Sequence, residues 1–509
     1  MSPENKETTS DETEKSTISR RDALKSMGAA AVAGLATAAA PAAMAAEAAP
    51  GTAPNPDKNP YGGGPGTGIS LPPYYKPTPY VKNNNVYFPG TEELGKDEMR
   101  ISFVGSCPWP PRRDQAGTAI MVELGNGKRF FFDFGNGCVH NIIAMQVPPA
   151  LINDIFLTHL HVDHYADLPY ILPFTAVSGR FKPLRVTGPS GRTPELGTKA
   201  MVENMRKMLR WHLEEFNTVP AGDGFEVEVT EFDFRKENDI CYNKDGVTVR
   251  HWPRSHGKDG ASAYRLDWNG LSFVWTGDGR PDELTVKYSQ GVDVFVTEAQ
   301  NDIAALMSLK TGFPPPLYNY VMDTHHTPHY AVGYLMQQIK PGLGMITHIE
   351  YEPELNAEVV AGVRQHWEGL FIMGAPDVKV INVTKDAIWA RDASLPELGS
   401  PARPKPQEMM AMMVEPGQPI PKEISFPPVK LPREQQQEAY VRKMEIDPAK
   451  YTPKDVQRPL VLEMPPITIN VQQMMAQKRQ AEEAKVSVEE LRKQIDGLQK
   501  MLDDKLKAK

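Results

Sequence analysis

Six consecutive residues, His159-Leu160-His161-Val162-Asp163-His164, constrain the fold of this chain more than any other feature. They bring three imidazoles and a carboxylate into one short stretch, and these are side chains that bind zinc in proteins. The preceding segment, Asp154–Thr158, is typical of a short apolar strand, whose period of two residues would direct the first two histidines to the same side. The aspartate and the third histidine then lie in the turn beyond. We therefore predict a metal site at the end of this strand, with a polar turn that merely contains histidines as the alternative.

The composition bounds the fold and excludes some partners. The 509 residues are 40% hydrophobic, enough to bury a substantial core, but the 47 prolines and 23 methionines are too unevenly placed for one uniform domain. The net charge of -8 argues against a general nucleic-acid binder, because such proteins carry an excess of Lys and Arg. Cys107, Cys138 and Cys241 are too few and too far apart for a disulfide framework or a paired-cysteine metal site, so we expect buried or partly buried thiols.

The first 45 residues resemble a twin-arginine export signal. The pair Arg20-Arg21 precedes an Ala- and Gly-rich apolar stretch from Met27 to about Ala40, and Ala43-Met44-Ala45 has the small-x-small pattern of a cleavage site. The stretch falls short of the roughly 20 strongly apolar residues that span a bilayer, which disfavours a retained anchor. The alternative is a cytoplasmic Ala-rich helix with a chance arginine pair. We expect transport by the twin-arginine machinery, cleavage near Ala45 and a periplasmic protein.

The composition changes again after the signal. Residues 46–97 are rich in Pro, Gly, Asn and Tyr, which predicts an extended arm laid on a surface. Residues 98–395 alternate apolar strands with helical stretches, which predicts an α/β core. Within it, Gly125-Asn126-Gly127 separates two apolar runs and predicts a β-hairpin. The segment Met201–Phe216 predicts one amphipathic helix with a solvated basic face.

Two segments follow the core. Residues 396–470 form a Pro- and Met-rich extension, and residues 471–509 predict an amphipathic helix. Its apolar residues recur three and four apart from Ala481 to Leu502, which is heptad spacing. Both a short coiled coil that joins chains into a homo-oligomer and a helix docked on the core fit this pattern.

Three further candidate ligands follow predicted strands downstream of the six-residue run. His256 lies in a polar loop after the strand 247–252, and His348 directly follows the apolar residues 344–347. Asp278 stands between Gly277 and Gly279 after a buried-looking strand, and glycine permits the close backbone approach that a crowded site requires. Each residue taken alone fits a structural role equally well. In this order they supply the remaining ligands of a two-metal site.

These residues resemble the metallo-β-lactamase superfamily, and within it the ribonuclease Z and arylsulfatase-like branch. The six-residue run is the most specific part of the resemblance, which spans roughly residues 98–392. Its other matches are Asp133-Phe134-Gly135, Leu184–Gly191, His256, Thr276-Gly277-Asp278, His325-His326-Thr327-Pro328 and Thr347-His348. The resemblance implies an α/β fold, the αβ/βα sandwich with metals at one edge, here with an N-terminal arm and a C-terminal Pro-rich and helical extension.

The resemblance also implies a set of metal ligands. It predicts two Zn2+ per chain, bridged by Asp278. The ligands implied for the first zinc are His159, His161 and His256, and those for the second are Asp163, His164 and His348.

The remaining roles follow from the same resemblance. Asp133 would support the ligands from behind, and Asp163 and His325 are the expected catalytic residues. His325 would protonate the leaving oxygen or hold the developing anion. His326 and His329 lie on the same segment and are the alternatives for this role, with a structural turn as the other interpretation of these two residues.

The expected function is an exported dinuclear zinc-dependent hydrolase, in which a hydroxide between the metals attacks a sulfate ester, a phosphodiester or a lactone. We expect a small-molecule ester and no nucleic acid as its partner. An exported protein does not meet precursor tRNA in the cytoplasm, and we find no basic, glycine-rich extension like the tRNA-holding arm of ribonuclease Z. Trp109, Trp211, Trp252 and Tyr351 are candidates to line an apolar pocket or to pack in the core. The alternative is a binding or scaffold protein with a non-catalytic metal site.

Replacing both arginines of the signal, Arg20 and Arg21, with Lys should leave the precursor in the cytoplasm, because the pair is the feature that the folded-protein route reads. Cell fractionation and immunoblotting would measure the distribution. Normal appearance of this variant in the periplasm would show that the pair is incidental.

Overall fold

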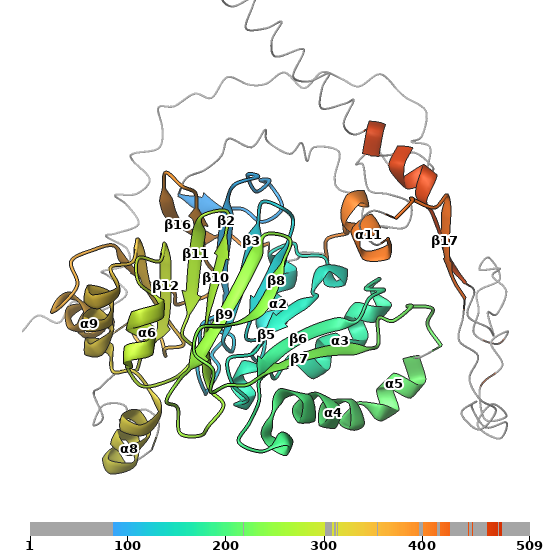
Figure 1. Cartoon of the computed structure of the whole chain (residues 1–509). Helices are drawn as coiled ribbons and strands as arrows, with labels where there is room; N and C mark the ends of the chain where they lie inside the picture. The colour runs from blue at the N-terminus through green and yellow to red at the C-terminus, as the bar shows by residue number, and fades with distance from the viewer. Residues whose placement is uncertain are drawn as a thin grey trace, which may run out of the picture. The chain divides into compact units, whose positions relative to one another are not determined.

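Two β-sheets packed face to face form the centre of the molecule (Figure 1). The computed structural model describes residues 85–396 except 217, 301–307, 310, 311, 313 and 354, and also residues 401–414, 418–427, 446, 450, 466–476 and 478–480. The first sheet has the strand order β1-β16-β15-β2-β3-β4-β5-β6-β7, and the second β14-β13-β12-β11-β10-β9-β8. Strands β4 to β7 run parallel to one another, as do β11 to β14. Parallel neighbours place their carboxyl ends at one edge, which is where α/β sheets carry their sites.

The strands of the first sheet are β1 (Val86–Tyr87), β16 (Ile388–Ala393), β15 (Lys379–Val383), β2 (Met99–Gly105), β3 (Ala119–Leu124), β4 (Arg129–Phe132), β5 (Asp154–Phe156), β6 (Leu184–Pro189) and β7 (Val227–Phe232). Those of the second are β14 (Phe371–Met373), β13 (Leu343–Thr347), β12 (Val294–Glu298), β11 (Leu271–Trp275), β10 (Ser262–Trp268), β9 (Val247–Pro253) and β8 (Asp239–Lys244).

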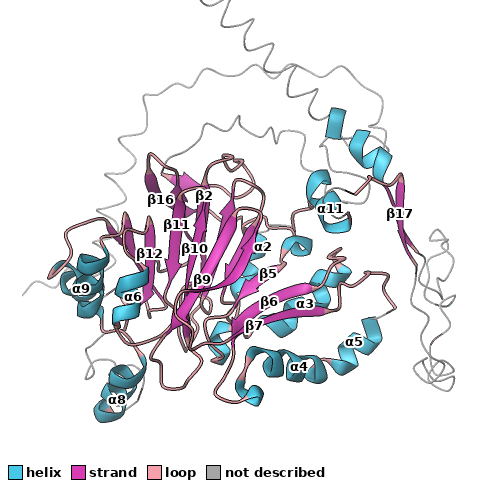
Figure 2. Cartoon of the chain, in the orientation of Figure 1, coloured by secondary structure: helices cyan, strands magenta, loops and turns pink. Residues whose placement is uncertain are grey.

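Helices cover the outer face of each sheet. The helices next to the first sheet are α2 (Cys138–Ala144), α3 (Leu168–Val177), α4 (Thr198–Met208) and α5 (Arg210–Phe216). Those next to the second are α6 (Glu283–Tyr288), α9 (His329–Ile339) and α10 (Asn356–Arg364), with α8 (Pro315–His325) beside them. In Figure 2, α6 and α9 lie on one side of the strands and α3 and α4 on the other. Among the described residues, no helix is long and apolar enough to cross a membrane.

Strand β3 shows why both faces of its sheet are covered. Its six residues are all buried. Ile120 and Val122 point into the core between the two sheets, whereas Ala119 and Met121 point into the core beneath α2 and α3. Because side chains alternate along a strand, a continuous apolar run is expected only where both faces are packed. The αβ/βα sandwich predicted from the sequence is confirmed.

Several local predictions are confirmed and others are corrected. The hairpin at residues 125–127 joins β3 and β4, as expected. The strand predicted over 154–158 ends at Phe156, so the first histidines lie in a loop and not on the strand. The helix predicted over 201–216 is two helices, which separate at Leu209. In the predicted arm, β1 pairs with β16. Cys107, Cys138 and Cys241 are free thiols, buried or partly buried as predicted.

The C-terminal extension contacts the sandwich in its described part. It contains α11 (Pro406–Met413) and the antiparallel pair β17 (Glu423–Phe426) and β18 (Ile467–Asn470). The ring of Phe426 stacks on Phe181 with centroids 4.2 Å apart, and Met412 packs against Ala150 and Leu151. Residues 471–476 are helical, as predicted. The signal 1–45 and the apolar stripe from Ala481 to Leu502 lie outside the described residues, so their predictions stay predictions.

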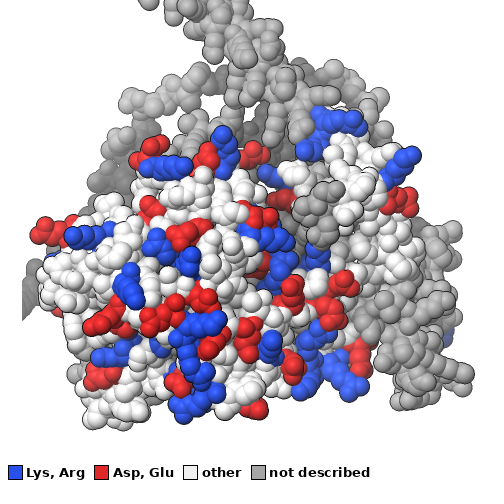
Figure 3. Space-filling model, viewed as in Figure 1, with Lys and Arg blue, Asp and Glu red and all other residues white. Residues whose placement is uncertain are grey.

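A buried charge ladder ties the first three strands of the hairpin region together. Glu123 on β3 lies directly opposite Arg100 on β2 and Arg129 on β4. Its carboxylate accepts from Arg100 Nε at 2.8 Å and from Arg129 Nη2 at 2.9 Å. Burial raises the pKa of Glu123, but the two arginines outweigh it and lower the pKa to about 2. By contrast, the surface in Figure 3 shows acidic and basic side chains intermingled and open to water.

Glu123→Gln is expected to lower the free energy of unfolding of the metal-free protein at neutral pH by about 3–5 kcal/mol, because it leaves two guanidiniums facing each other without a counter-charge. A carboxyl with a lowered pKa stabilises the fold above its unfolded pKa of 4.5, and that stabilisation is lost as the pH falls towards about 2. The difference between variant and wild type should therefore close over this range.

Urea unfolding followed by circular dichroism at several pH values would measure the difference. Glu214→Gln, which breaks the exposed i,i+4 pair with Arg210 on α5, is the matched control and should show no measurable loss. Equal behaviour of the two variants at neutral pH would contradict a stabilising ladder.

Candidate metal centre

The predicted ligands converge at the edge of the sandwich where parallel strands from both sheets end. The segments that reach this edge are Asp133 after β4, His159–His164 after β5, His256 between β9 and β10, Asp278 after β11, Glu298 at the end of β12 and His348 after β13. Residues 162–164 form the short 3-10 helix η2. The fold thus assembles one cluster from segments almost two hundred residues apart.

The first ligand group consists of His159, His161, His256 and Asp278, whose nearest ligand atoms all lie within 4.8 Å of one another. His161 Nδ1 is 3.0 Å from His256 Nε2. Asp278 Oδ2 is 3.8 Å from both His159 Nε2 and His256 Nε2. This is the set predicted for the first metal, with the proposed bridging carboxylate included.

The second ligand group consists of Asp163, His164 and His348, whose ligand atoms also lie within 4.8 Å of one another. His164 Nε2 is 3.2 Å from His348 Nε2, and Asp163 Oδ2 is 3.4 Å from His348 Nε2. Asp278 Oδ2 reaches this group as well, at 3.4 Å from His164 Nε2 and 3.3 Å from His348 Nε2. One carboxylate therefore faces both groups, as a bridging ligand would.

Hydrogen bonds behind the cluster fix which ring nitrogen faces inward. His256 Nδ1 donates to the carbonyl of His325 at 2.6 Å, and because a carbonyl only accepts, the neutral ring presents the lone pair of Nε2 to the cluster. His164 Nδ1 lies 2.9 Å from Asp133 Oδ2, which leaves Nε2 facing inward in the same way. Such outer partners orient metal-binding histidines in known sites.

Asp133 supports more than His164. Its carboxylate accepts from the backbone N–H of Thr158 at 2.8 Å and from Trp275 Nε1 at 2.8 Å. It therefore ties the ligand loop after β5 to β11 of the other sheet, as its predicted supporting role requires. The glycine expected beside the bridging aspartate is also needed, because Gly277 has φ +58° and a Cβ there would lie 2.7 Å from Thr158 Cβ.

Burial keeps three of the histidines neutral. It lowers the pKa of His159 well below its usual value and that of His256 to about 3, because the interior disfavours the imidazolium. The pKa of His161 is lowered for the same reason. Neutral imidazole is the form that binds a metal.

In the other half of the cluster, neighbouring charges shift the pKa values of His164 and Asp278. Burial lowers the pKa of His164, but the carboxylates of Asp278, Asp133 and Asp163 outweigh it and raise the pKa well above its usual value. Burial raises the pKa of Asp278, but His348 and His164 outweigh it and hold the pKa well below its usual range. Positive charge near the carboxylates of Asp278, Asp133 and Asp163 is therefore stabilising, and divalent cations would supply it in place of a proton.

The donor set fits two zinc ions. Within the part of the chain that the structure describes, His159 Nε2 and Asp278 Oδ1 are buried and have no hydrogen-bond partner. Buried polar atoms are almost always paired, so unpaired atoms on two residues of one ligand group indicate a missing partner. Nitrogen and carboxylate oxygen donors without sulfur match the ligands of catalytic zinc sites.

The segment after α8 places His326 at the cluster, and His326 is one of the three neighbouring histidines among which the sequence left the catalytic role open. His326 Nδ1 is 3.1 Å from both carboxylate oxygens of Glu298, and its ligand atom groups with those of Asp278 and His348. Burial lowers the pKa of His326, but Glu298 outweighs it and raises the pKa to about 9. Glu298 was missed in the sequence because an acidic residue at the end of an apolar strand carries no motif.

His325 precedes His326 in the chain and belongs to none of the ligand groups among the described residues. Its Nδ1 lies 2.6 Å from the hydroxyl of Thr324, and its ring centroid is 5.3 Å from that of His256. Its hydrogen bond to the first ligand group is made by its backbone carbonyl, which accepts from His256. His329 begins α9 and belongs to neither ligand group.

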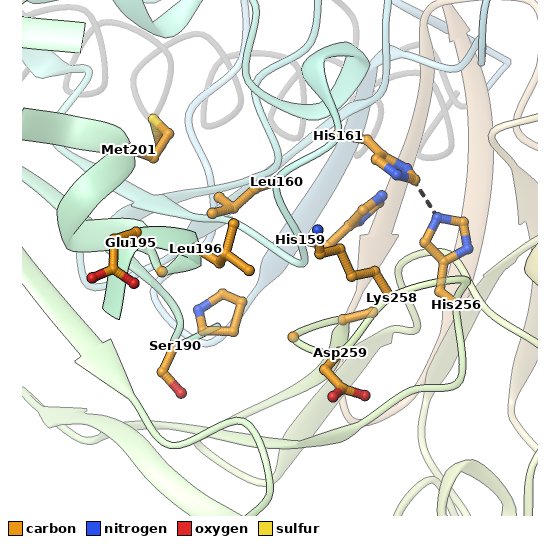
Figure 4. A pocket seen from close by; sticks show the side chains of 14 residues that line it. His159, Leu160, His161, Ser190, Glu195, Leu196, Met201, His256, Lys258 and Asp259 are labelled. Carbon is orange, nitrogen blue, oxygen red and sulfur yellow. Dashed lines mark hydrogen bonds between the residues drawn. The ribbon is translucent and has the colours of Figure 1, made fainter. Parts of the chain in front are cut away.

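A cavity of about 270 Å³ opens beside the first ligand group (Figure 4). His159, His161 and His256 form one side. The other side is formed by Pro189, Ser190, Glu195, Leu196, Gly197 and Met201. The aromatic residues that we considered as pocket-forming do not line it. Trp109 and Trp211 are exposed, whereas Trp252 is buried in the core.

The chain resembles characterised proteins over its central part. Residues 112–184 match the family model described as the metallo-beta-lactamase superfamily. The chain is 26% identical over 279 residues to ribonuclease Z of Mycobacterium marinum, which is 53% of this chain and 91% of that protein. It is 28% identical over 303 residues to ribonuclease BN of Proteus mirabilis, which is 52% of this chain and 93% of that protein. The short form of human tRNase Z aligns with 49% of this chain and 92% of its own at 17% identity and a TM-score of 0.38.

These relatives confirm some expectations and contradict one. A metal-dependent hydrolase of the metallo-β-lactamase fold is confirmed. The expectation of a small-molecule substrate without nucleic acid is wrong, because the matched relatives are ribonucleases. The net charge of -8 misled us because it sums over the whole chain, whereas a phosphate is recognised locally.

Asp133→Asn is expected to weaken zinc binding about ten- to hundredfold, because it removes the charge that orients His164. Competition with a chromophoric chelator would measure the affinity. Asp245→Asn is the matched control, since Asp245 also has a positive φ but its carboxylate forms a surface ion pair with Lys128, away from the cluster. Unchanged affinity in Asp133→Asn would reject its supporting role.

Proposed function

We propose that this chain of the metallo-β-lactamase superfamily is a two-zinc phosphodiesterase that hydrolyses RNA. The observation that carries the proposal is that Asp278 faces both ligand groups, with the His326–Glu298 pair beside them. The names of the relatives, ribonuclease Z and ribonuclease BN, support RNA as the substrate class, and the matches span 91% and 93% of those proteins.

The ligands define what the metals contribute. His159, His161 and His256 would hold one zinc, Asp163, His164 and His348 the other, and Asp278 would bridge them. When bound, a zinc pair lowers the pKa of water and withdraws negative charge from phosphate oxygens.

The protein's own contribution is to place protons. In hydrolysis, a water oxygen attacks phosphorus, the bond from phosphorus to the leaving oxygen breaks, and that oxygen takes up a proton. We assign this proton to the Nε2 of His326, because Glu298 accepts from its Nδ1 and so holds the protonated ring in place. Asp163, whose side chain is 24% exposed against 2% for Asp278, remains the candidate to receive the proton of the attacking water.

Zinc-loaded protein should contain two zinc ions per chain, and Asp278→Ala should contain at most one and show no turnover. The reason is that loss of the shared carboxylate removes a ligand from both sites, while the large core keeps the chain folded. Elemental analysis and circular dichroism would measure metal and fold. A wild-type stoichiometry near one, unchanged by added zinc, would contradict the two-metal reading.

His326→Ala is expected to lower kcat on a hairpin RNA with a single-stranded 3′ extension by about 10²–10⁴-fold, the usual contribution of a general acid. His325→Ala is the matched control, and its kcat should stay within about tenfold because the backbone carbonyl that accepts from His256 is retained. Gel analysis of end-labelled RNA would give the rates.

The opposite order of effects would return the catalytic role to His325, as the sequence resemblance suggested. If zinc-loaded wild type cleaves no RNA at all, the proposed function fails. A binding or scaffold protein with a non-catalytic metal site would then be the better interpretation.

We also propose that the enzyme is exported in a folded state to the periplasm. The support is the sequence of residues 1–45, with Arg20-Arg21 before an apolar stretch. Export after folding would deliver the metals already bound, and RNA that reaches the periplasm would be the substrate.

A further inference from the structure

We infer that the cavity beside the first ligand group binds the nucleobase next to the scissile phosphate. The inference rests on the proposed function and adds the part of the substrate that the protein recognises. It is carried by the shape and lining of the cavity, which continues directly from the metal ligands.

Three loops from different parts of the chain build the cavity. They are the ligand loop after β5, the segment from Pro189 at the end of β6 to Met201 on α4, and the loop between β9 and β10. The last two loops are held together across the rim, where Arg192 donates to Asp259 at 2.8 Å. If the phosphate of a nucleotide lies at the metal centre, its base would therefore point into this preformed cavity.

The wall opposite the histidines is apolar. It is formed by Leu160, Pro189, Leu196 and Met201. Figure 4 shows Leu196 and Met201 on the side away from His161 and His256. Leu196 is 43% exposed, an unpacked aliphatic side chain that faces open space. The volume of 270 Å³ exceeds the roughly 150 Å³ of an apolar protein cavity that binds benzene, so a pyrimidine or purine ring has room.

The polar residues of the lining suit a nucleotide better than a purely apolar group. Lys258 lies two residues after the ligand His256, and among the described residues no carboxylate is found paired with it. It is therefore available to a phosphate oxygen of the RNA backbone. Ser190 and Glu195 offer a donor and acceptors at the far end, where the edge of a base would lie.

The test compares adenosine 5′-monophosphate with ribose 5-phosphate, which shares its phosphate and sugar but lacks the base. Isothermal titration of zinc-loaded wild type should show the nucleotide binding about ten- to hundredfold more tightly, the usual effect of packing one base against protein. Leu196→Trp fills the cavity and should abolish this preference while leaving ribose 5-phosphate affinity unchanged. Met201→Trp provides a second filling variant if the first does not fold.

Two controls separate the base from the phosphate. Met208→Trp adds the same bulk to α4 at a position that is 67% exposed and outside the cavity, and it should keep the preference. Lys258→Ala should weaken both ligands equally and so preserve their ratio.

Equal affinities of the two ligands for wild type, no detectable nucleotide binding, or a preference that survives both filling variants would overturn the inference. RNA cleavage is measured separately. If the protein cleaves RNA but shows no base preference, base binding in the cavity is rejected and the proposed function stands. If it shows a base preference but no cleavage, the proposed function is rejected and base binding stands.

Discussion

The candidate metal centre depends on one buried carboxylate, Asp278, which faces four imidazole nitrogens at 3.3–3.8 Å where the ends of two sheets meet. A buried charge is costly unless it is paired, so the surrounding chain must present either protons or cations to it. Asp133 and the carbonyl of His325 orient the rings, and Gly277 lets the loop approach closely enough. Each of these features helps to bring imidazole nitrogens close to the charge of Asp278.

The sequence was most informative where the chemistry is local. The six-residue run 159–164 contains four candidate ligands in one loop, so its spacing predicted a metal site. The order of His256, Asp278 and His348 after strands predicted that they would join this run, and the structure brings all of these side chains into one cluster, because parallel strands bring their ends together. The strand was predicted to extend to Thr158, but β5 ends at Phe156. The reason is that the backbone N–H of Thr158 donates to the carboxylate of Asp133.

The sequence was least informative where function depends on pairing across space. His326 and Glu298 are 28 residues apart, and neither has a spacing that predicts their contact. The positions of His325 and His326 depend on where α8 ends: its last residue is His325, and His326 then adopts an extended backbone with φ −126°. The cavity was missed for a related reason, since its wall is aliphatic and comes from three separate loops, whereas we had looked for aromatic residues.

Because the ligands come from both sheets, bound metal would clamp the two halves of the sandwich at one edge. His161 and His256 are 95 residues apart in the sequence, and His164 and His348 are 184 apart. An unfolded chain cannot hold such ligands together, so metal binding favours only the closed sandwich and adds its free energy to the stability of the fold. Metal content would then be a measure of how many chains have both sheets packed together. In a chain with only one sheet folded, the carboxylates of the cluster would be exposed to water.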